Sequence, residues 1–218
     1  MKIIFVAGSW GSGTTALAGA LAKLGVSAFG PHFRTNDPRT PASFELIPFR
    51  NLILGFVDEA TVSFKGDRSD ELVAALRSFA EALERGDHGA WSADRPKRAL
   101  LKMPLATICL PQITAVFETS IILVHRRFDE IEASRKRRNW PAYFGAAGAR
   151  TIYSRAISDL AQLETSYLAI SYLDLKRDTE GTLQNVMEFC GLQDLRINLP
   201  DACAFVRNDE GKRADGSP

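Results

Sequence analysis

The chain of 218 residues has no long apolar run, no paired cysteine motif and almost no excess of charge. No stretch approaches the roughly 18 continuous apolar residues that a membrane span requires. The opening run KIIFVAG reaches a glycine too early for the apolar region of a signal peptide. The sequence therefore predicts neither a membrane span nor a leader, and we expect the protein in the cytoplasm.

The charged and sulfur-containing residues exclude further classes. The 27 basic and 26 acidic residues leave a formal charge of +1, so no overall field would attract nucleic acid. Cys109, Cys190 and Cys203 are odd in number and lack C-x-x-C spacing, which favours reduced, buried thiols over disulfides or zinc. The three histidines show no metal-site spacing. We therefore expect neither a metal nor a nucleic-acid partner.

Apolar runs and helical periodicities alternate along the chain. The runs KIIFVAG, RALLKMP, TSIILVHRR and SYLAISYLDL are predicted to contain strands. Helices are predicted at 14–25, 70–86, 128–138, 149–164 and 178–192. This alternation predicts a three-layer α/β/α sandwich around a mostly parallel sheet of four or five strands.

Length and composition predict how this fold is divided. A hydrophobic content of 45% suits one compact domain, which we expect over residues 1–207, followed by a disordered polar tail at 208–218. The proline-rich stretch 31–48 is predicted to be a long loop over the carboxyl edge of the sheet.

The stretch VAGSWGSGTTALAGAL, at 6–21, differs from the phosphate-binding P-loop at one position. Gly8, Gly13 and Thr15 are in register with G-x-x-x-x-G-K-[ST], but Thr14 stands where the lysine should be. The order of strand, glycine loop and helix predicts a site in which backbone N–H groups and a helix N-terminus bind phosphate. Because the missing lysine normally holds β- and γ-phosphates, we expect a phosphate of another kind, with both threonine hydroxyls as donors.

A second anion site is predicted further along the chain. Arg126 follows an apolar strand, and Ser134 lies eight positions later, about two turns into the next helix. Arginine offers a fixed fork of donors to a phosphate, and serine adds a hydroxyl. Taken alone this pair is weak, since a basic helix end such as RKRR is typical of a solvated face.

Together these motifs resemble those of the sulfotransferases that use 3′-phosphoadenosine-5′-phosphosulfate (PAPS). GSWGSGTT resembles their 5′-phosphosulfate loop, and RRFDEIEAS resembles their 3′-phosphate motif. LLKMPLATICLP is similar to a segment with a lysine followed by proline, and ISYLDLKRDTEGTLQNVMEFCGL to a tyrosine-bearing strand and the helix after it. The resemblance extends over 3–192 with four motifs in the family's order, which is far more specific than any one of them.

The resemblance implies a donor and a set of residues that hold it. PAPS has no γ-phosphate, which explains the missing lysine, and its sulfonate is transferred without a metal, leaving 3′,5′-bisphosphoadenosine. The implied contacts are the 5′-phosphosulfate with Gly11, Ser12, Gly13, Thr14 and Thr15, the 3′-phosphate with Arg126 and Ser134, and the adenine with Tyr172. The acceptor is expected to be a hydroxyl, or an amine, of a small molecule, sugar or lipid.

The acceptor is expected to lie against two stretches that mix aromatic and polar residues. These are 31–65 and 139–150, which contain Phe33, Phe44, Trp140, Tyr143 and Phe144. Such a composition suits a sugar, a phenol or a lipid head group equally well.

One position departs from the family pattern. The residue before S-G-T-T is usually a cation in the family, and here it is Gly11. Loss of a preorganised charge at a developing anion costs about two to three orders of magnitude in rate. Lys102, which matches a lysine position in the family, is our candidate for that charge, and Arg34 is a second possible donor.

An alcohol acceptor also needs a base, because its hydroxyl loses a proton as it attacks sulfur. Glu45 is the first candidate, where relatives carry a glutamate, and His32 is the second, since its ordinary pKa suits the task. We expect His125, next to Arg126, to be a structural residue at a strand end, and a further donor to the nucleotide is the alternative. His88 and Asp94, which flank GAWSADRP, are candidates for the acceptor wall.

Two other functions remain open from the sequence. A P-loop kinase is supported by the strand, loop and helix order, and opposed by Thr14 and by the lack of an evident aspartate-ended strand for magnesium. A non-catalytic nucleotide-binding module is supported by Gly11. Dependence on ATP and magnesium would identify the first, and binding without turnover the second.

Overall fold

The computed structural model describes residues 1–35, 37, 42–91, 97–163 and 165–214, with residues 208–214 described by their backbone alone. Its centre is a sheet in the order β6-β1-β7-β8 in which every neighbouring pair is parallel. The strands are β1 (Lys2–Ala7), β6 (Arg98–Lys102), β7 (Glu118–His125) and β8 (Tyr167–Ser171). The predicted α/β fold with a mostly parallel sheet is confirmed.

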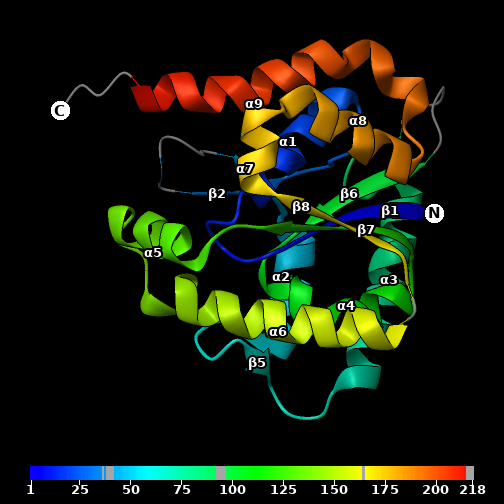
Figure 1. The fold of residues 1–218 in the computed structure, drawn as a ribbon. Coiled ribbons are helices and arrows are strands. Elements are labelled where there is room, and N and C mark those ends of the chain that lie inside the picture. Colours follow the sequence, from blue (N-terminus) through cyan, green and yellow to red (C-terminus); the bar gives the residue numbers. More distant parts are fainter. Residues whose placement is uncertain (36, 38–41, 92–96, 164, 215–218) are drawn as a thin grey trace.

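Both faces of the sheet are covered by helices, as continuous apolar strands require (Figure 1). Side chains alternate along β1, so that Ile4 and Val6 pack on one face and Ile3 and Phe5 on the other. The first face is covered by α1 (Thr14–Leu24), α8 (Thr179–Cys190) and α9 (Leu199–Ala214). The second is covered by α2 (Ile47–Phe56), α3 (Ser69–Arg85), α4 (Leu110–Thr114) and α6 (Ala146–Leu163).

The remaining elements are short, apart from α5, which carries the second predicted anion motif. They are β4 (Val57–Asp58), β5 (Ser63–Phe64), η1 (Leu105–Cys109), α5 (Phe128–Arg137), η2 (Ala142–Phe144), α7 (Tyr172–Arg177) and η3 (Gln193–Asn198). The five predicted helices correspond to α1, α3, α5, α6 and α8, whereas α2, α4, α7 and α9 were not expected. Helix α9 continues through Ala214, and disorder of the tail at 208–218 stays a prediction. No helix within the described ranges is both long and apolar enough to cross a bilayer.

The stretch 31–48 is not the long loop that its prolines suggested. It contains the antiparallel pair β2 (His32–Arg34) and β3 (Ala42–Leu46), and it runs directly into α2. Pro48 stands in the first turn of α2, where proline is tolerated because that turn has no helical partner for its N–H. The prolines that indicated a loop therefore include one that begins a helix.

The parallel arrangement places four strand ends along one edge of the sheet. The glycine loop, 8–13, connects the end of β1 to α1 at this edge. Lys102 ends β6 and is the register partner of Val6, two residues before the loop. Arg126 directly follows β7, and Tyr172 directly follows β8. Ligands bind such sheets at this carboxyl edge, so the fold brings all four segments to the expected place.

Candidate functional site

A cavity of about 760 Å³ opens at the carboxyl edge of the sheet. It is lined by the glycine loop, the β2–β3 pair, α2, the end of β6, α5, the segment around η2 and the start of α7. The predicted site residues that line it are Gly11, Gly13, Thr14, Thr15, Glu45, Lys102, Arg126, Ser134 and Tyr172. Residues from four separate motifs thus share one space.

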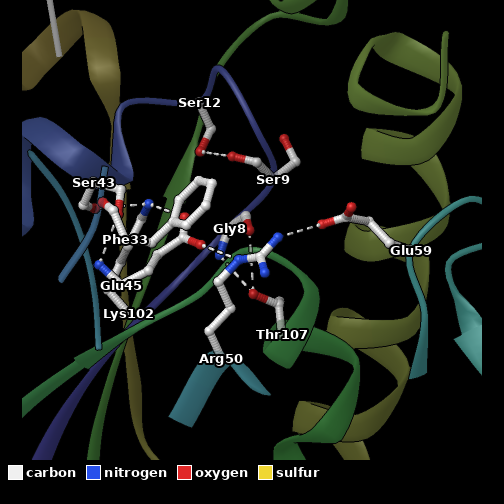
Figure 2. Close-up of polar contacts among 10 residues, drawn as sticks. All are labelled: Gly8, Ser9, Ser12, Phe33, Ser43, Glu45, Arg50, Glu59, Lys102 and Thr107. Carbon is white, nitrogen blue, oxygen red and sulfur yellow. Dashed lines mark hydrogen bonds and ion pairs between the residues drawn. The ribbon is translucent and has the colours of Figure 1, made fainter. Parts of the chain in front are cut away.

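The hydroxyl groups of Thr107 and Tyr153 form hydrogen bonds with the backbone at the start of the loop. The Gly8 N–H donates to Thr107 Oγ1 at 2.9 Å, and the same hydroxyl donates to the Gly8 carbonyl oxygen at 3.2 Å (Figure 2). The Ser9 N–H donates to Tyr153 Oη at 3.5 Å, and Tyr153 Oη donates to the Val124 carbonyl at 2.9 Å. Burial raises the Tyr153 pKa, which keeps this phenol protonated and able to donate.

The loop leaves backbone donors for a ligand. Gly13 is the N-cap of α1, with φ of 102°, and it offers no side chain to cap the helix. The first N–H groups of a helix have no helical partner, and the first two residues of α1, Thr14 and Thr15, line the cavity. The Ser12 side chain is fully buried, and its hydroxyl donates to the Ser9 carbonyl at 2.7 Å. A helix N-terminus of this kind can bind an anion without a lysine.

The second predicted anion motif meets the loop directly. Arg126 Nη1 lies 3.4 Å from the Gly11 carbonyl oxygen, although the two residues are 115 positions apart. Ser134 is 2% exposed and lies beside Gly11, where an added Cβ would be 3.7 Å from Ser134 Oγ. Arg126 Nε also pairs with Glu130 Oε2 at 2.7 Å, which orients the guanidinium. The motif and the loop therefore form one surface.

Tyr172 completes this surface and has an unused polar group. Its ring lies under the Arg126 guanidinium, 4.8 Å from the centroid, and against Gly13, where any Cβ would overlap the ring. The buried Tyr172 hydroxyl has no hydrogen-bond partner among the residues that the structure describes. An unsatisfied buried hydroxyl is costly, so it favours a ligand at this place. These residues fit a ligand that has two anionic groups and a polar, flat part.

Lys102 and Glu45, predicted separately as cation and base, form a buried pair. Lys102 is 3% exposed, and its Nζ donates to Glu45 Oε1 at 2.8 Å and to the Ser43 carbonyl at 3.1 Å. Glu45 Oε2 lies 3.6 Å from Arg50 Nε, and Arg50 Nη2 lies 3.4 Å from Glu59 Oε1. Figure 2 shows the four charged groups in a chain. Burial raises the Glu59 pKa, more than the nearby Arg50 lowers it.

Arg50 and Glu59 line the cavity, but neither was predicted as a site residue from the sequence. They fall within 31–65, the stretch expected to hold the acceptor, but no local pattern marks them. Their positions follow from α2, the helix that was not predicted.

Aromatic residues line another part of the cavity. Trp10, in the glycine loop, lies 4.4 Å from Phe144 between ring centroids, and Tyr143 lies 4.6 Å from Phe144. Trp140 joins them at 5.8 Å from Phe144. Trp140, Tyr143 and Phe144 were expected at the acceptor, whereas Trp10 was not singled out. Phe44, which was also expected there, packs against Phe205 and is not among the lining residues.

The other candidates occupy different places. His32 does not line the cavity, and its Nε2 lies 2.9 Å from the Ala28 carbonyl oxygen. Arg34 does line it. His88 stacks on Phe79 at 5.5 Å between centroids. His125 is exposed at the end of β7 and is not among the lining residues, and Asp94 falls outside the described residues.

The cysteines and the groups that could bind a metal ion complete the comparison with the sequence-based predictions. The three cysteines are free and buried, as predicted, and burial raises the pKa of Cys190 to about 12. Within the described part of the chain, no group of three or more His, Cys, Asp or Glu side chains is arranged to hold a metal ion.

The fold and the site define an α/β protein with a glycine-rich loop and a cavity at the carboxyl edge of a parallel sheet. Residues 4–195 match the sulfotransferase family, and the chain belongs to that family. A search of curated proteins found no match. Among solved structures, sulfotransferase STF9 from Mycobacterium avium is similar, with a TM-score of 0.57 and 13% identity over 99% of this chain and 68% of that chain. At this identity the likeness concerns the fold.

Proposed function

We propose that the protein transfers a sulfonate group from PAPS to a hydroxyl group of a small molecule, sugar or lipid. Membership of the sulfotransferase family supports sulfonate transfer. The observation that carries the choice of donor is the contact of Arg126 and Ser134 with Gly11. One cavity thereby offers two adjoining sites for anions, and PAPS has a 5′-phosphosulfate and a 3′-phosphate to place in them.

Each part of the donor has a partner in this arrangement. The N–H groups of Thr14 and Thr15 would hold the 5′-phosphosulfate, as helix N-termini hold phosphates. Arg126 and Ser134 would hold the 3′-phosphate, which distinguishes this nucleotide from ADP and ATP. Tyr172 would offer its ring and its unpartnered hydroxyl to the nucleoside. When bound, PAPS supplies an activated sulfonate and leaves as 3′,5′-bisphosphoadenosine.

Lys102 would supply the charge that Gly11 lacks. Its ammonium group is held in place by Glu45 and the Ser43 carbonyl, so it is preorganised before any ligand binds. A fixed charge of this kind stabilises negative charge that develops during transfer. Arg34 also lines the cavity and remains the alternative.

Glu45 would be the base that accepts the proton of the acceptor hydroxyl. Lys102 and Arg50 orient its two oxygens, and the carboxylate faces the cavity. His32 is second, because its Nε2 is already directed at the Ala28 carbonyl.

One alternative has an observation in its favour. Gly11 in place of a cation would suit a module that binds the nucleotide without transferring sulfonate. Such a module would bind 3′,5′-bisphosphoadenosine but release no product from PAPS with any acceptor. A P-loop kinase would instead prefer ATP with magnesium.

Calorimetric titration with 3′,5′-bisphosphoadenosine, ADP and ATP with magnesium tests the donor. We expect the bisphosphate to bind best without metal, and Arg126→Ala to weaken it about 100-fold, since charged hydrogen bonds contribute about 1.5–3 kcal/mol each. Arg127→Ala is the matched control, because the neighbouring Arg127 side chain is 75% exposed and pairs with Asp129 at 2.8 Å. Tighter binding of ATP with magnesium, or no binding, would contradict the proposal.

A further inference from the structure

The chain of charged groups next to Lys102 is balanced within itself. Two cations, Lys102 and Arg50, alternate with two carboxylates, Glu45 and Glu59, and all four line the cavity (Figure 2). The four charges sum to zero, and the outer pair, Arg50 with Glu59, leaves no net charge for the acceptor. The side chains of Arg50 and Glu59 are 19% and 27% exposed, so this outer pair can be reached from the cavity.

A charged acceptor fits this part of the cavity poorly. An anionic acceptor would displace Glu59 from Arg50 and leave a half-buried carboxylate without its partner. An ammonium group would displace Arg50 from Glu59 in the same way. Breaking one partner from a buried pair is strongly unfavourable, because the remaining charge is not compensated.

An apolar acceptor fits no better. Covering Arg50 and Glu59 with a hydrocarbon or an unsubstituted phenol would remove their water and return no hydrogen bond. A hydroxyl group differs from both, since it donates to a carboxylate and accepts from a guanidinium. A molecule with several hydroxyls can replace the water and leave the ion pair intact.

Aromatic rings beside this pair suit the rest of such a molecule. Phe33 is 39% exposed and lines the cavity, with the Arg50 guanidinium 4.4 Å from its ring centroid. Trp10 adds a second ring at the glycine loop. Ring faces of this kind can cover the C–H surface of a cyclic polyol, while its hydroxyls reach the ion pair.

We propose that the acceptor is a neutral, polyhydroxylated molecule such as a sugar or a cyclitol, and that Arg50 and Glu59 determine this specificity. The inference rests on the proposed sulfotransferase function and identifies its substrate class. The acceptor oxygen would form a bond to sulfur while the bond from sulfur to the bridging oxygen of the 5′-phosphate breaks. The acceptor proton passes to Glu45, and 3′,5′-bisphosphoadenosine leaves with the bridging oxygen and its electron pair.

Release of 3′,5′-bisphosphoadenosine from PAPS, measured with matched acceptors, tests the substrate class. The panel contains methyl glucoside and inositol as neutral polyols, glucuronic acid as an anion, glucosamine as a cation, and a cresol and octanol as apolar alcohols. We expect kcat/KM for a neutral polyol to exceed that of every other class by at least about tenfold, a difference of about 1.4 kcal/mol. A higher value for any other class overturns the inference.

Binding to the complex with 3′,5′-bisphosphoadenosine distinguishes the two proposals. If no acceptor is turned over, preferential binding of a polyol to this complex supports the substrate class, and absence of polyol binding overturns it. In that second case the donor proposal stands, since the bisphosphate still binds. If the bisphosphate itself does not bind, the proposed function fails, and the substrate class fails with it.

Substitution of Glu59 tests the residue assignment. Glu59→Gln should raise KM for the polyol by about tenfold, the effect of losing a charged hydrogen-bond partner, and leave kcat and affinity for the bisphosphate within about twofold. Glu81→Gln, on the exposed surface of α3, is the matched control. An unchanged KM in a folded Glu59→Gln protein, checked by circular dichroism, would remove Glu59 from the acceptor site.

Discussion

The two halves of the cavity differ in whether their polar groups already have partners within the protein. We call the loop 8–15 with Arg126, Ser134 and Tyr172 the donor half, and Lys102, Glu45, Arg50 and Glu59 the acceptor half. In the donor half, α1 begins at Thr14 without a side-chain cap, and the buried Tyr172 hydroxyl has no partner among the described residues, which suits an anionic ligand. The acceptor half pairs its own charges, which suits a neutral molecule. The donor half therefore has polar groups that a ligand could satisfy, whereas the charges of the acceptor half already pair with one another.

The two halves also differ in how they are built. Most of the donor half lies in loops and helix starts that follow parallel strands, so the sheet itself positions it. The acceptor half depends on β3, α2 and the residue after β4. Glu45 of β3 pairs with Lys102, Arg50 of α2 lies beside Glu45, and Glu59 after β4 pairs with Arg50. The expected effects of substitutions differ accordingly.

The largest effect is expected where the halves meet, at Lys102. Lys102→Met should lower kcat by about 100- to 1000-fold, because a preorganised charge is lost, and leave the affinity for 3′,5′-bisphosphoadenosine within about twofold. Steady-state kinetics with calorimetry measure both quantities. Lys23→Met, on the exposed side of α1, controls for the substitution. An unchanged kcat would assign the charge elsewhere, with Arg34 next.

Gly13 tests the packing of the donor half. Gly13→Ala should destabilise the protein by about 2–4 kcal/mol and weaken binding of the bisphosphate, because φ is positive and the Cβ overlaps the Tyr172 ring. Gly66→Ala is the control, since Gly66 has φ of 77° but open space around its Cβ. Chemical denaturation of both variants separates the cost of φ from that of the overlap. Equal losses would mean that Tyr172 moves aside freely.

Ser134 tests a single contact of the donor half. Ser134→Ala should weaken binding of 3′,5′-bisphosphoadenosine about tenfold, the usual effect of one hydrogen bond to a charged group, and leave ADP binding unchanged. Calorimetry with both nucleotides gives the comparison. An equal loss for ADP would place Ser134 away from the 3′-phosphate.

A substitution at Gly11 tests whether Lys102 already supplies the charge of the cation that the family usually has at this position. An added Cβ would make only ordinary contacts with Ser134 and Ile131, at 3.7 and 3.8 Å, so a longer side chain has room, although φ of 74° strains the backbone of any residue other than glycine and lowers stability. Gly11→Lys alone should change kcat less than about threefold, and it should restore about tenfold of the loss in Lys102→Met. A large gain from Gly11→Lys alone would show that the wild-type protein lacks this charge.

The smallest expected effect concerns the stability of the acceptor half. Because burial raises the Glu59 pKa, the folded protein binds this proton more tightly than the unfolded chain, so stability falls as pH rises from the ordinary glutamate pKa through the raised value. Glu59→Gln should therefore have an equal or higher Tm at pH 7. The difference should shrink as the pH falls below the ordinary pKa, where both side chains are neutral. A lower Tm at pH 7 would show that the pair with Arg50 stabilises the fold.

The sequence predicted best those parts that depend on neighbouring residues. Buried parallel strands are continuous apolar runs, and the strand, glycine loop and helix form one local unit, so the sheet and the order of these three elements were both predicted. Arg126 directly follows β7 and Ser134 lies in the next helix, α5, so their spacing is also a local feature of the sequence. Helix α2 was not predicted, because proline interrupts a helix in its interior but is tolerated in its first turn, where Pro48 lies.

What the sequence determined by itself was the α/β sheet, the glycine loop between strand and helix, and the motifs of the sheet's carboxyl edge, since each is encoded within about ten neighbouring residues. The tertiary structure alone decided that Lys102 pairs with Glu45, 57 positions away, and that Arg50 and Glu59 extend this pair into a balanced chain. It also placed Tyr172 against Gly13, with no hydrogen-bond partner for its hydroxyl in the part of the chain that the structure describes. Contacts between distant segments depend on packing, and no local spacing encodes them.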